Sequence, residues 1–85
     1  MDGAKENEFP RELTLKAVYR IGNGDTEVKL RKILEQFDQD FIITNKSSSK
    51  QKFISYTISA YYETETNLTD VCTVLAEIEG FMMMV

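Results

Sequence analysis

Two stretches of alternating polarity decide the fold of this chain: LTLKAVYRI, Leu13–Ile21, and FISYTISAYY, Phe53–Tyr62. An apolar residue at every second position is typical of a β-strand that buries one side and exposes the other. The odd positions of the first stretch are expected to face the core. The even positions of the second are expected to do so, because Ser and Thr fill the middle of its odd positions. We predict two long antiparallel strands that share one buried face.

Two shorter strands and two helices complete the pattern. The run FIIT, Phe41–Thr44, is β-branched and aromatic and predicts a short strand, as does FMMMV, Phe81–Val85. A first helix is expected to begin at Asp25 or Thr26, with Asp25 as a good N-cap, and a second to begin with Asn67 as its cap. Apolar residues at helical spacing support both helices. The stripes are Leu30, Ile33, Leu34 and Phe37 in the first, and Leu68, Val71, Cys72, Leu75 and Ile78 in the second.

The order strand, helix, strand, strand, helix, strand defines the fold class. Two βαβ units interlocked in this way make an α+β, ferredoxin-like βαββαβ sandwich, in which a four-stranded antiparallel sheet carries two helices on one face. Right-handed crossovers place the first and third strands at the centre of the sheet. Gly80 is expected to end the second helix as a left-handed C-cap.

Residues 9–85 are expected to form this single domain. Pro10 favours extended geometry at Phe9, and the Phe9 ring is expected to fold back onto the core as an anchor. Residues 1–8, MDGAKENE, are polar and small, and a flexible N-terminal tail is expected there.

Composition excludes several classes of function. The chain has 85 residues, which is one small domain, and 10 Lys and Arg against 14 Asp and Glu give a net charge of −4. It has no His and one Cys, so neither an internal disulfide nor a zinc site of the Cys/His type is available. No apolar run approaches the length of a membrane span. We expect a cytoplasmic protein that binds no cofactor and no membrane.

Charge is distributed unevenly along the chain. No Lys or Arg follows Lys52, so the last part of the sequence is acidic. Its acidic residues are Glu63, Glu65, Asp70, Glu77 and Glu79. A basic spot is expected at the polar loop 46–52, KSSSKQK, and an acidic surface around the second helix. That surface either keeps the protein soluble or steers a basic partner protein towards it.

The residues offer little for catalysis. A copper chaperone would need two Cys in the loop after the first strand, and none is there. Cys72 lies on a helix stripe, where it is expected to be a small buried hydrophobe, and the chain has no His to activate it. Glu63 and Glu65 fall in a polar turn, where paired carboxylates are poorly placed for acid–base work. We expect a protein that is not an enzyme.

Nucleic acid is a further alternative, because RNA-recognition motifs share this strand order. They display stacking aromatics on their central strands beside basic residues. Phe53, Tyr61, Lys16 and Arg20 are expected to point outward from the third and first strands. The glycine-rich signature of those motifs is missing, however, and the net charge of −4 opposes phosphate binding. These observations argue against a nucleic-acid partner.

The first candidate for ligand binding is the loop Gly22, Asn23, Gly24 and Asp25. It leads into a helix N-terminus, where backbone N–H groups can hold an anion or a carboxylate. An N-capping Asp25 would compete with a bound anion for those donors. The alternative is a turn that simply requires glycine.

The second candidate is the loop that contains Ser48, Ser49 and Lys50. Hydroxyl groups, free N–H groups and ammonium groups at such a loop can bind phosphate. The alternative is a solvated connection between two strands of a hairpin.

Three features together resemble the YbeD-like proteins, a family of small bacterial proteins of unassigned function. They are Phe9-Pro10, the run Ser48-Ser49-Lys50 followed by the strand FISYTIS, and the ending LTDVCTVLAEIEGFMMMV. Ser55 also matches a Ser that recurs in the third strand of the family. Gln51 stands where the family has Gly, so the loop does not keep a glycine-only conformation.

The resemblance implies a ferredoxin-like fold similar to regulatory domains of the ACT kind, which bind amino acids or similar small molecules, often between subunits. It also implies a link to lipoate metabolism and supplies no catalytic residues. We expect a regulatory domain that senses an amino acid or a lipoate-related acid near residues 22–25, across the contact of a dimer. The alternative is an adaptor that binds a protein partner through the edge strand 41–44 or through its acidic surface.

Overall fold

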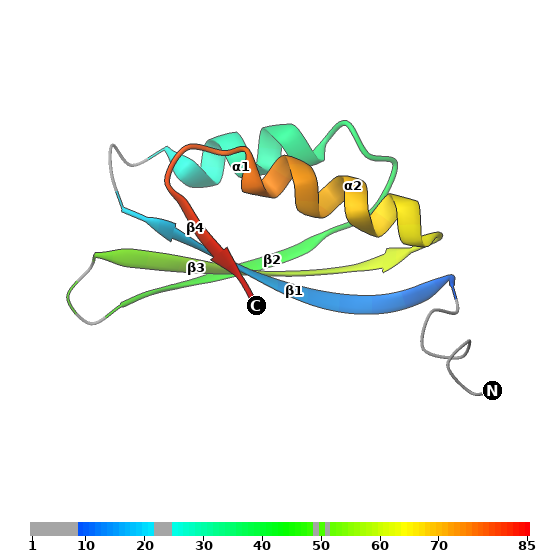
Figure 1. Ribbon diagram of the computed structural model, residues 1–85, viewed down its shortest axis with the longest axis horizontal. Coiled ribbons are helices and arrows are strands. Elements are labelled where there is room, and N and C mark those ends of the chain that lie inside the picture. The colour runs from blue at the N-terminus through cyan, green and yellow to red at the C-terminus, as the bar shows by residue number, and fades with distance from the viewer. Residues whose placement is uncertain (1–8, 22–24, 49, 51) are drawn as a thin grey trace.

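The two alternating stretches lie side by side at the centre of a four-stranded sheet (Figure 1). The structure is a computed structural model and describes residues 9–21, 25–48, 50 and 52–85, so the tail expected at 1–8 lies outside the described residues. The elements are β1 (Arg11–Arg20), α1 (Thr26–Leu34), β2 (Ile42–Ser47), β3 (Phe53–Tyr62), α2 (Glu65–Ala76) and β4 (Phe81–Met84). The strand order β2-β3-β1-β4 confirms the ferredoxin-like α+β sandwich.

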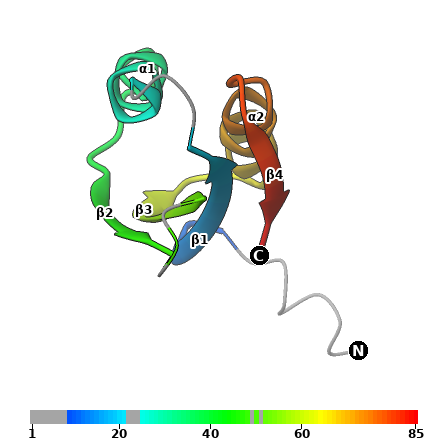
Figure 2. The same ribbon diagram turned by 90° about the vertical axis from the view of Figure 1, so that its left-hand side faces the viewer.

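The two helices cover one face of the sheet and leave the other open. Figure 2 shows α1 above the β2 side and α2 above the β4 side of the same face. Within the described ranges, no helix combines the length and apolar character that a membrane crossing needs. The uncovered side is called the open face below.

The pairing of β1 with β3 sets which residues reach the core. The two strands pair antiparallel over ten residues, from Arg11 opposite Tyr62 to Arg20 opposite Phe53. The even positions of β3 face the helices as predicted, and the odd positions of β1 do so too. The buried core consists of Ala17, Tyr19, Leu30, Leu34, Tyr56, Ile58, Ala60, Tyr62, Val71, Leu75 and Ile78. Phe9 packs against this core, as expected of an anchor.

The strand β2 is longer than predicted and begins one residue later. It extends through Asn45, Lys46 and Ser47, which were expected to lie at the end of the strand or in the loop 46–52. These polar residues form a strand because they lie in register opposite β3, from Tyr56 to Ile54. An edge strand exposed to solvent has no need of apolar side chains.

The second helix also differs from its prediction. Its N-cap is Thr64, not Asn67, since Thr64 is extended and its Oγ1 accepts a hydrogen bond of 3.0 Å from the backbone N–H of Asn67. Gly80 is left-handed, with φ of 94°, but it lies in the turn before β4 rather than at the C-cap, which is Glu77. A Cβ at Gly80 would lie 3.2 Å from the backbone O of Arg20, so glycine also allows a close approach there.

Tyr19 joins the sheet to α2. Its hydroxyl donates a hydrogen bond of 2.6 Å to the backbone O of Leu75, in the last turn of the helix, and the whole side chain is buried. Its ring makes edge contacts with Tyr56 and Phe81, at 5.9 and 5.7 Å between centroids. Tyr62 is buried as well, but its hydroxyl has no hydrogen-bond partner among the described residues.

Replacing each of these two tyrosines by Phe compares the stability lost with a hydrogen-bonded hydroxyl and with one that has no partner among the described residues. Tyr19→Phe is expected to lower the free energy of unfolding by about 1–2 kcal/mol, because a buried hydrogen bond is lost. Tyr62→Phe is expected to leave it unchanged or raise it, since the hydroxyl it removes is buried without a partner. Urea unfolding followed by circular dichroism measures both, and equal losses in the two variants would contradict this assignment.

The same burial predicts how stability depends on pH. Desolvation raises the pKa of Tyr62 from 10.0 to about 12, with a smaller contribution from Cys72, and desolvation also raises the pKa of Tyr19. A folded-state pKa above the unfolded one favours the protonated fold, so this stability is complete below about pH 10 and is lost as the pH rises towards 12. Urea unfolding between pH 7 and pH 12 is expected to show that fall, and Tyr62→Phe to make it shallower. An equally steep fall in the variant would be the contrary result.

Candidate functional site

The corner before α1 is only partly described. Gly22, Asn23 and Gly24, three of the predicted ligand-binding residues, lie outside the described residues. Asp25 holds the N-cap position, but its carboxylate does not cap the helix, which corrects the expectation that it would occupy the N-terminal donors. The backbone of Asp25 is not in the extended conformation usual for a side-chain cap. Its carboxylate instead lies 3.8 Å from the ammonium group of Lys29.

The Ser48 side chain closes the β2–β3 hairpin. Its Oγ accepts hydrogen bonds from the backbone N–H groups of Lys52, at 3.1 Å, and Phe53, at 3.2 Å. Its own N–H donates to the backbone O of Phe53 at 2.8 Å. Of the other predicted loop residues, Lys50 is exposed and Ser49 lies outside the described residues. The motif therefore has a structural role at Ser48.

The open face carries most of the outward-pointing residues that the sequence predicted. Lys16 and Arg20 of β1 share it with Phe53 and Tyr61 of β3, because residues paired across a sheet point to the same side. Lys46 of β2 joins them, opposite Ser55. The sequence predicted Lys46 to lie in the loop 46–52. It lies instead in β2, which continues past Thr44.

A hollow of about 330 Å³ lies on this face beside the β2–β3 hairpin, and it is called the open-face hollow below. It is lined by Lys16, Val18, Lys46, Ser47, Ser48, Phe53 and Ser55. Lys16 and Lys46 supply two ammonium groups from strands that β3 separates. Val18 and Phe53 supply apolar surface between and beside them. The hollow brings Ser48 together with residues from three strands.

Hydrogen bonding inside the hollow leaves donors available. The hydroxyl of Ser55 donates to the backbone O of Lys46 at 3.3 Å, whereas the Ser48 hydroxyl accepts two bonds and keeps its own proton free. Neither Lys16 nor Lys46 forms an ion pair with any part of the chain that the structure describes. Ammonium groups donate hydrogen bonds but cannot accept them, so a ligand of this hollow must supply acceptors. An anion does so best, because its charge strengthens the hydrogen bonds.

The bases on the helix side differ because two of them are paired with acids. Arg31 donates to Glu27 at 2.9 Å, and Lys29 lies 3.7 Å from Glu79 as well as near Asp25. The helix α2 itself carries no basic residue. The charge asymmetry of the sequence thus becomes an acidic α2 and an open face on which Lys16 and Lys46 form no ion pair within the described ranges.

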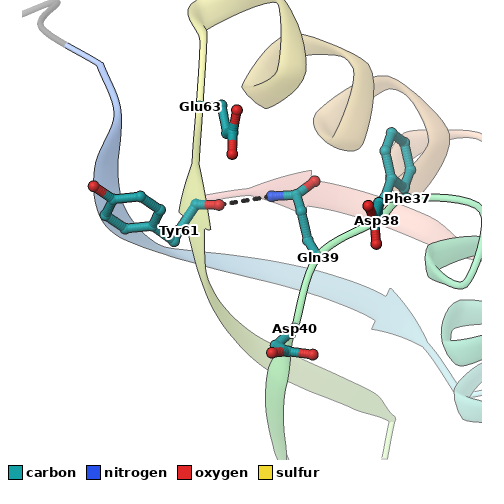
Figure 3. A pocket seen from close by; sticks show the side chains of 6 residues that line it. All are labelled: Phe37, Asp38, Gln39, Asp40, Tyr61 and Glu63. Atoms are coloured by element: carbon teal, nitrogen blue, oxygen red, sulfur yellow. Dashed lines mark hydrogen bonds between the residues drawn. The ribbon is translucent and has the colours of Figure 1, made fainter.

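A second hollow, of about 320 Å³, lies where the α1–β2 connection meets the end of β3 (Figure 3). It is lined by Phe37, Asp38, Gln39, Asp40, Tyr61 and Glu63. The Gln39 amide donates to the backbone O of Tyr61 at 2.9 Å and accepts from Asn67 at 2.8 Å. These bonds tie the connection to β3 and α2, so we assign this hollow a structural role.

The acidic groups of this second hollow do not form a metal site. Figure 3 shows the carboxylates of Asp38, Asp40 and Glu63 spread around Gln39 without converging on one point. No cluster of three or more potential ligands for a metal ion occurs in the described part of the chain.

Cys72 is half-buried on α2. Burial raises the pKa of its thiol, so the group stays protonated at neutral pH. The thiolate is the reactive form, and this environment therefore disfavours nucleophilic chemistry at Cys72.

The sheet order and the placement of the helices define a small α+β domain with the ferredoxin-like fold. By fold it is similar to the solution structure of HP0495 from H. pylori, with a TM-score of 0.75 at 16% identity over 92% of this chain and 84% of that one. It is also similar to the ACT domain from GTP pyrophosphokinase of Chlorobium tepidum, with a TM-score of 0.71 at 15% identity over 87% and 82% of the two chains. These likenesses concern the fold alone.

The chain belongs to the family described as "Protein of unknown function (DUF493)", which matches residues 4–85. This is the YbeD-like family, so the resemblance drawn from the sequence is confirmed. A second solution structure of HP0495, from Helicobacter pylori, is also similar, with a TM-score of 0.67 at 18% identity over 91% and 87% of the two chains. A search of the curated proteins finds no match.

The structural role of Ser48 is open to test. Ser48→Ala is expected to lower the free energy of unfolding by about 1 kcal/mol, because two backbone N–H groups lose their acceptor. Amide hydrogen exchange is expected to accelerate at Lys52 and Phe53, whose N–H groups bond to Ser48. Ser47→Ala is the matched control, since Ser47 is exposed. Unchanged exchange at both amides would rule out the bonding scheme.

Proposed function

We propose that this protein is a non-enzymatic regulatory domain that binds a small organic acid in the open-face hollow. The choice of an organic acid agrees with the ligand expected from the sequence, which is an amino acid or a lipoate-related acid. The site differs from the one expected at 22–25, because Lys16 and Lys46 line the hollow without ion pairs in the described ranges, whereas the Asp25 carboxylate lies 3.8 Å from Lys29. Membership of a family of unknown function leaves the role open, and the ACT-like fold supports a regulatory one.

One observation carries this proposal: two unpaired ammonium groups stand beside apolar surface in the same hollow. Lys16 and Lys46 would bind the carboxylate, and the Ser48 hydroxyl would donate a third hydrogen bond. Val18 and Phe53 would cover the hydrocarbon part of the ligand. A hollow of about 330 Å³ is at the small end of ligand sites, which suits an acid of modest size.

The polarity of the site separates the two expected ligand classes. A lipoate-related acid presents one carboxylate on an aliphatic chain, which matches two lysines beside Val18 and Phe53. A free amino acid adds an ammonium group, and none of the described residues that line the hollow is acidic and could receive it. We therefore favour an aliphatic carboxylate over an amino acid.

The test is a titration of the ¹⁵N-labelled protein with octanoate, lipoate, octanamide and leucine. Octanoate and lipoate are expected to shift the amides of Lys16, Val18, Lys46 and Phe53 in a saturable way. Octanamide lacks the charge and leucine carries an extra ammonium group, so both are expected to bind more weakly. The acids are expected to be recovered chemically unchanged after incubation.

Lysine variants connect the binding to the hollow. Lys46→Gln is expected to weaken octanoate binding about fivefold, the effect of about 1 kcal/mol at an exposed ion pair. Lys32→Gln on α1 removes the same charge from the helix side and is expected to leave binding unchanged. If octanamide binds as tightly as octanoate, or no probe moves the hollow, the proposal fails.

A further inference from the structure

The outer edge of β2 has free backbone groups at alternate residues. Ser48 N–H donates to the backbone O of Phe53, so this opposed pair is hydrogen-bonded, and the pairs two, four and six residues along must be bonded as well. Ile42, Thr44 and Lys46 therefore direct their N–H and C=O groups to β3. The residues between them direct theirs outward, where the described part of the chain supplies no partner; they are Ile43, Asn45 and Ser47.

An independent hydrogen bond supports this alternation. Ile21 N–H donates to the backbone O of Lys52 at 2.9 Å, which continues the pairing of β1 with β3. The even residues of β3 are thereby bonded to β1, and its odd residues remain for β2. The pairing of β3 with β1 and its pairing with β2 therefore identify the same residues of β2 as bonded to β3.

A groove runs along the helix side of this edge, between α1 and β2. Its volume is about 240 Å³, and it is lined by Arg31, Leu34, Glu35, Gln39, Phe41 and Ile43. Leu34, Phe41 and Ile43 give it an apolar floor. A strand added to the edge would point every second side chain towards this groove and the others over the open face.

The helix side and the open face of the β2 edge favour different side chains in an added strand. On the helix side, the apolar floor favours an apolar residue opposite Ile43. On the open face, Lys46 is exposed, has no ion pair within the described ranges, and favours an acidic residue. Alternation of apolar and acidic residues satisfies both sides at once.

A second copy of this chain fits that requirement poorly. Two β2 edges paired antiparallel would place two Lys46 side chains on the same face, and like charges repel. Their helix sides would bring Asn45 and Ser47 into the pairing, which are polar. The edge strand β4 is shorter, and its register with β1 is irregular between Val18 and Tyr19, so it is the weaker template.

We propose that the free edge of β2 binds an extended segment of a partner protein in which apolar and acidic residues alternate, as an added antiparallel strand. The added residues opposite Ile43, Asn45 and Ser47 exchange backbone hydrogen bonds with them, and the apolar side chain opposite Ile43 lies over the groove. The added acidic residues lie beside Lys46. This is strand addition, in which the backbone supplies affinity and alternate side chains supply specificity. The inference does not rest on the ligand of the open-face hollow.

The probe is an eight-residue peptide in which valine and glutamate alternate, with N-methyl groups on the glutamate amides. Methylation leaves the valine N–H groups free for β2 and blocks the other edge, so the peptide cannot grow into a sheet of more than two strands. Binding is expected to slow amide exchange about tenfold or more at Ile43, Asn45 and Ser47. Exchange at Thr44 and Lys46, already bonded to β3, is expected to change little. A merely electrostatic contact would not produce this alternation.

Two control peptides keep the sequence pattern. The same peptide methylated on its valine amides is expected not to bind, because it presents no donors to β2. A peptide with lysine in place of glutamate is expected to bind at least about fivefold more weakly. Equal binding by either control overturns the proposal, as does the absence of any protection with the first peptide.

Variants of the protein complete the test. Asn45→Pro removes an outward N–H without breaking a bond to β3, and is expected to abolish peptide binding. Asn45→Ala keeps that donor and is expected to bind as the natural chain does. Sedimentation of the natural chain and of both variants tests whether a second copy occupies the edge. If the natural chain is a dimer and Asn45→Pro dissociates it, the edge belongs to a second copy and the proposal is overturned.

Discussion

The ten-residue pairing of β1 with β3 is the constraint on which the rest of the structure depends. Side chains alternate between the two faces of a strand, so this one register decides which residues enter the core and which reach the open face. A slip of β1 by one residue against β3 would expose Tyr19 and bury Lys16. The buried hydrogen bond from Tyr19 to Leu75 then locks α2 over the same face. The same register places Lys16, which has no ion pair within the described ranges, on the open face.

The sequence was sufficient for the features that depend on periodicity. Both long strands, both helices, the strand order and the outward direction of Phe53 and Tyr61 follow from alternation and helical spacing, and the structure confirms them. Periodicity says nothing, however, about a polar edge. The strand β2 continues through Lys46 because β3 is there to pair with it, and that partner comes from a different part of the chain. The cap of α2 was missed for a related reason. Thr64 and Asn67 are both good caps, and only the extended backbone at Thr64 selects between them.

The candidate site was harder to predict than the fold. The sequence drew attention to two loops, because glycine, serine and lysine near a turn are local signals. The open-face hollow has no local signal: Lys16, Lys46 and Phe53 come from three strands and meet only when the sheet forms. The Ser48 loop contributes to it, but its hydroxyl also holds the hairpin together, which a motif alone does not distinguish. Composition gave the sign of the protein's charge, whereas the pairing of the strands decides that Lys16 and Lys46 meet in one hollow.

Lys46 connects the two proposals made for this surface. It lines the open-face hollow, and it stands on the strand whose outer edge is free. A carboxylate in the hollow and an acidic side chain on an added strand would both be drawn to the same ammonium group, and neutralising it once removes most of the attraction for a second acid. Coupling between two sites is reciprocal, so an acid that weakens strand addition must itself be weakened by the strand by the same factor. A shared charge at the boundary of a pocket and a sheet edge is thus a simple physical means by which a small domain can make a protein contact depend on a metabolite.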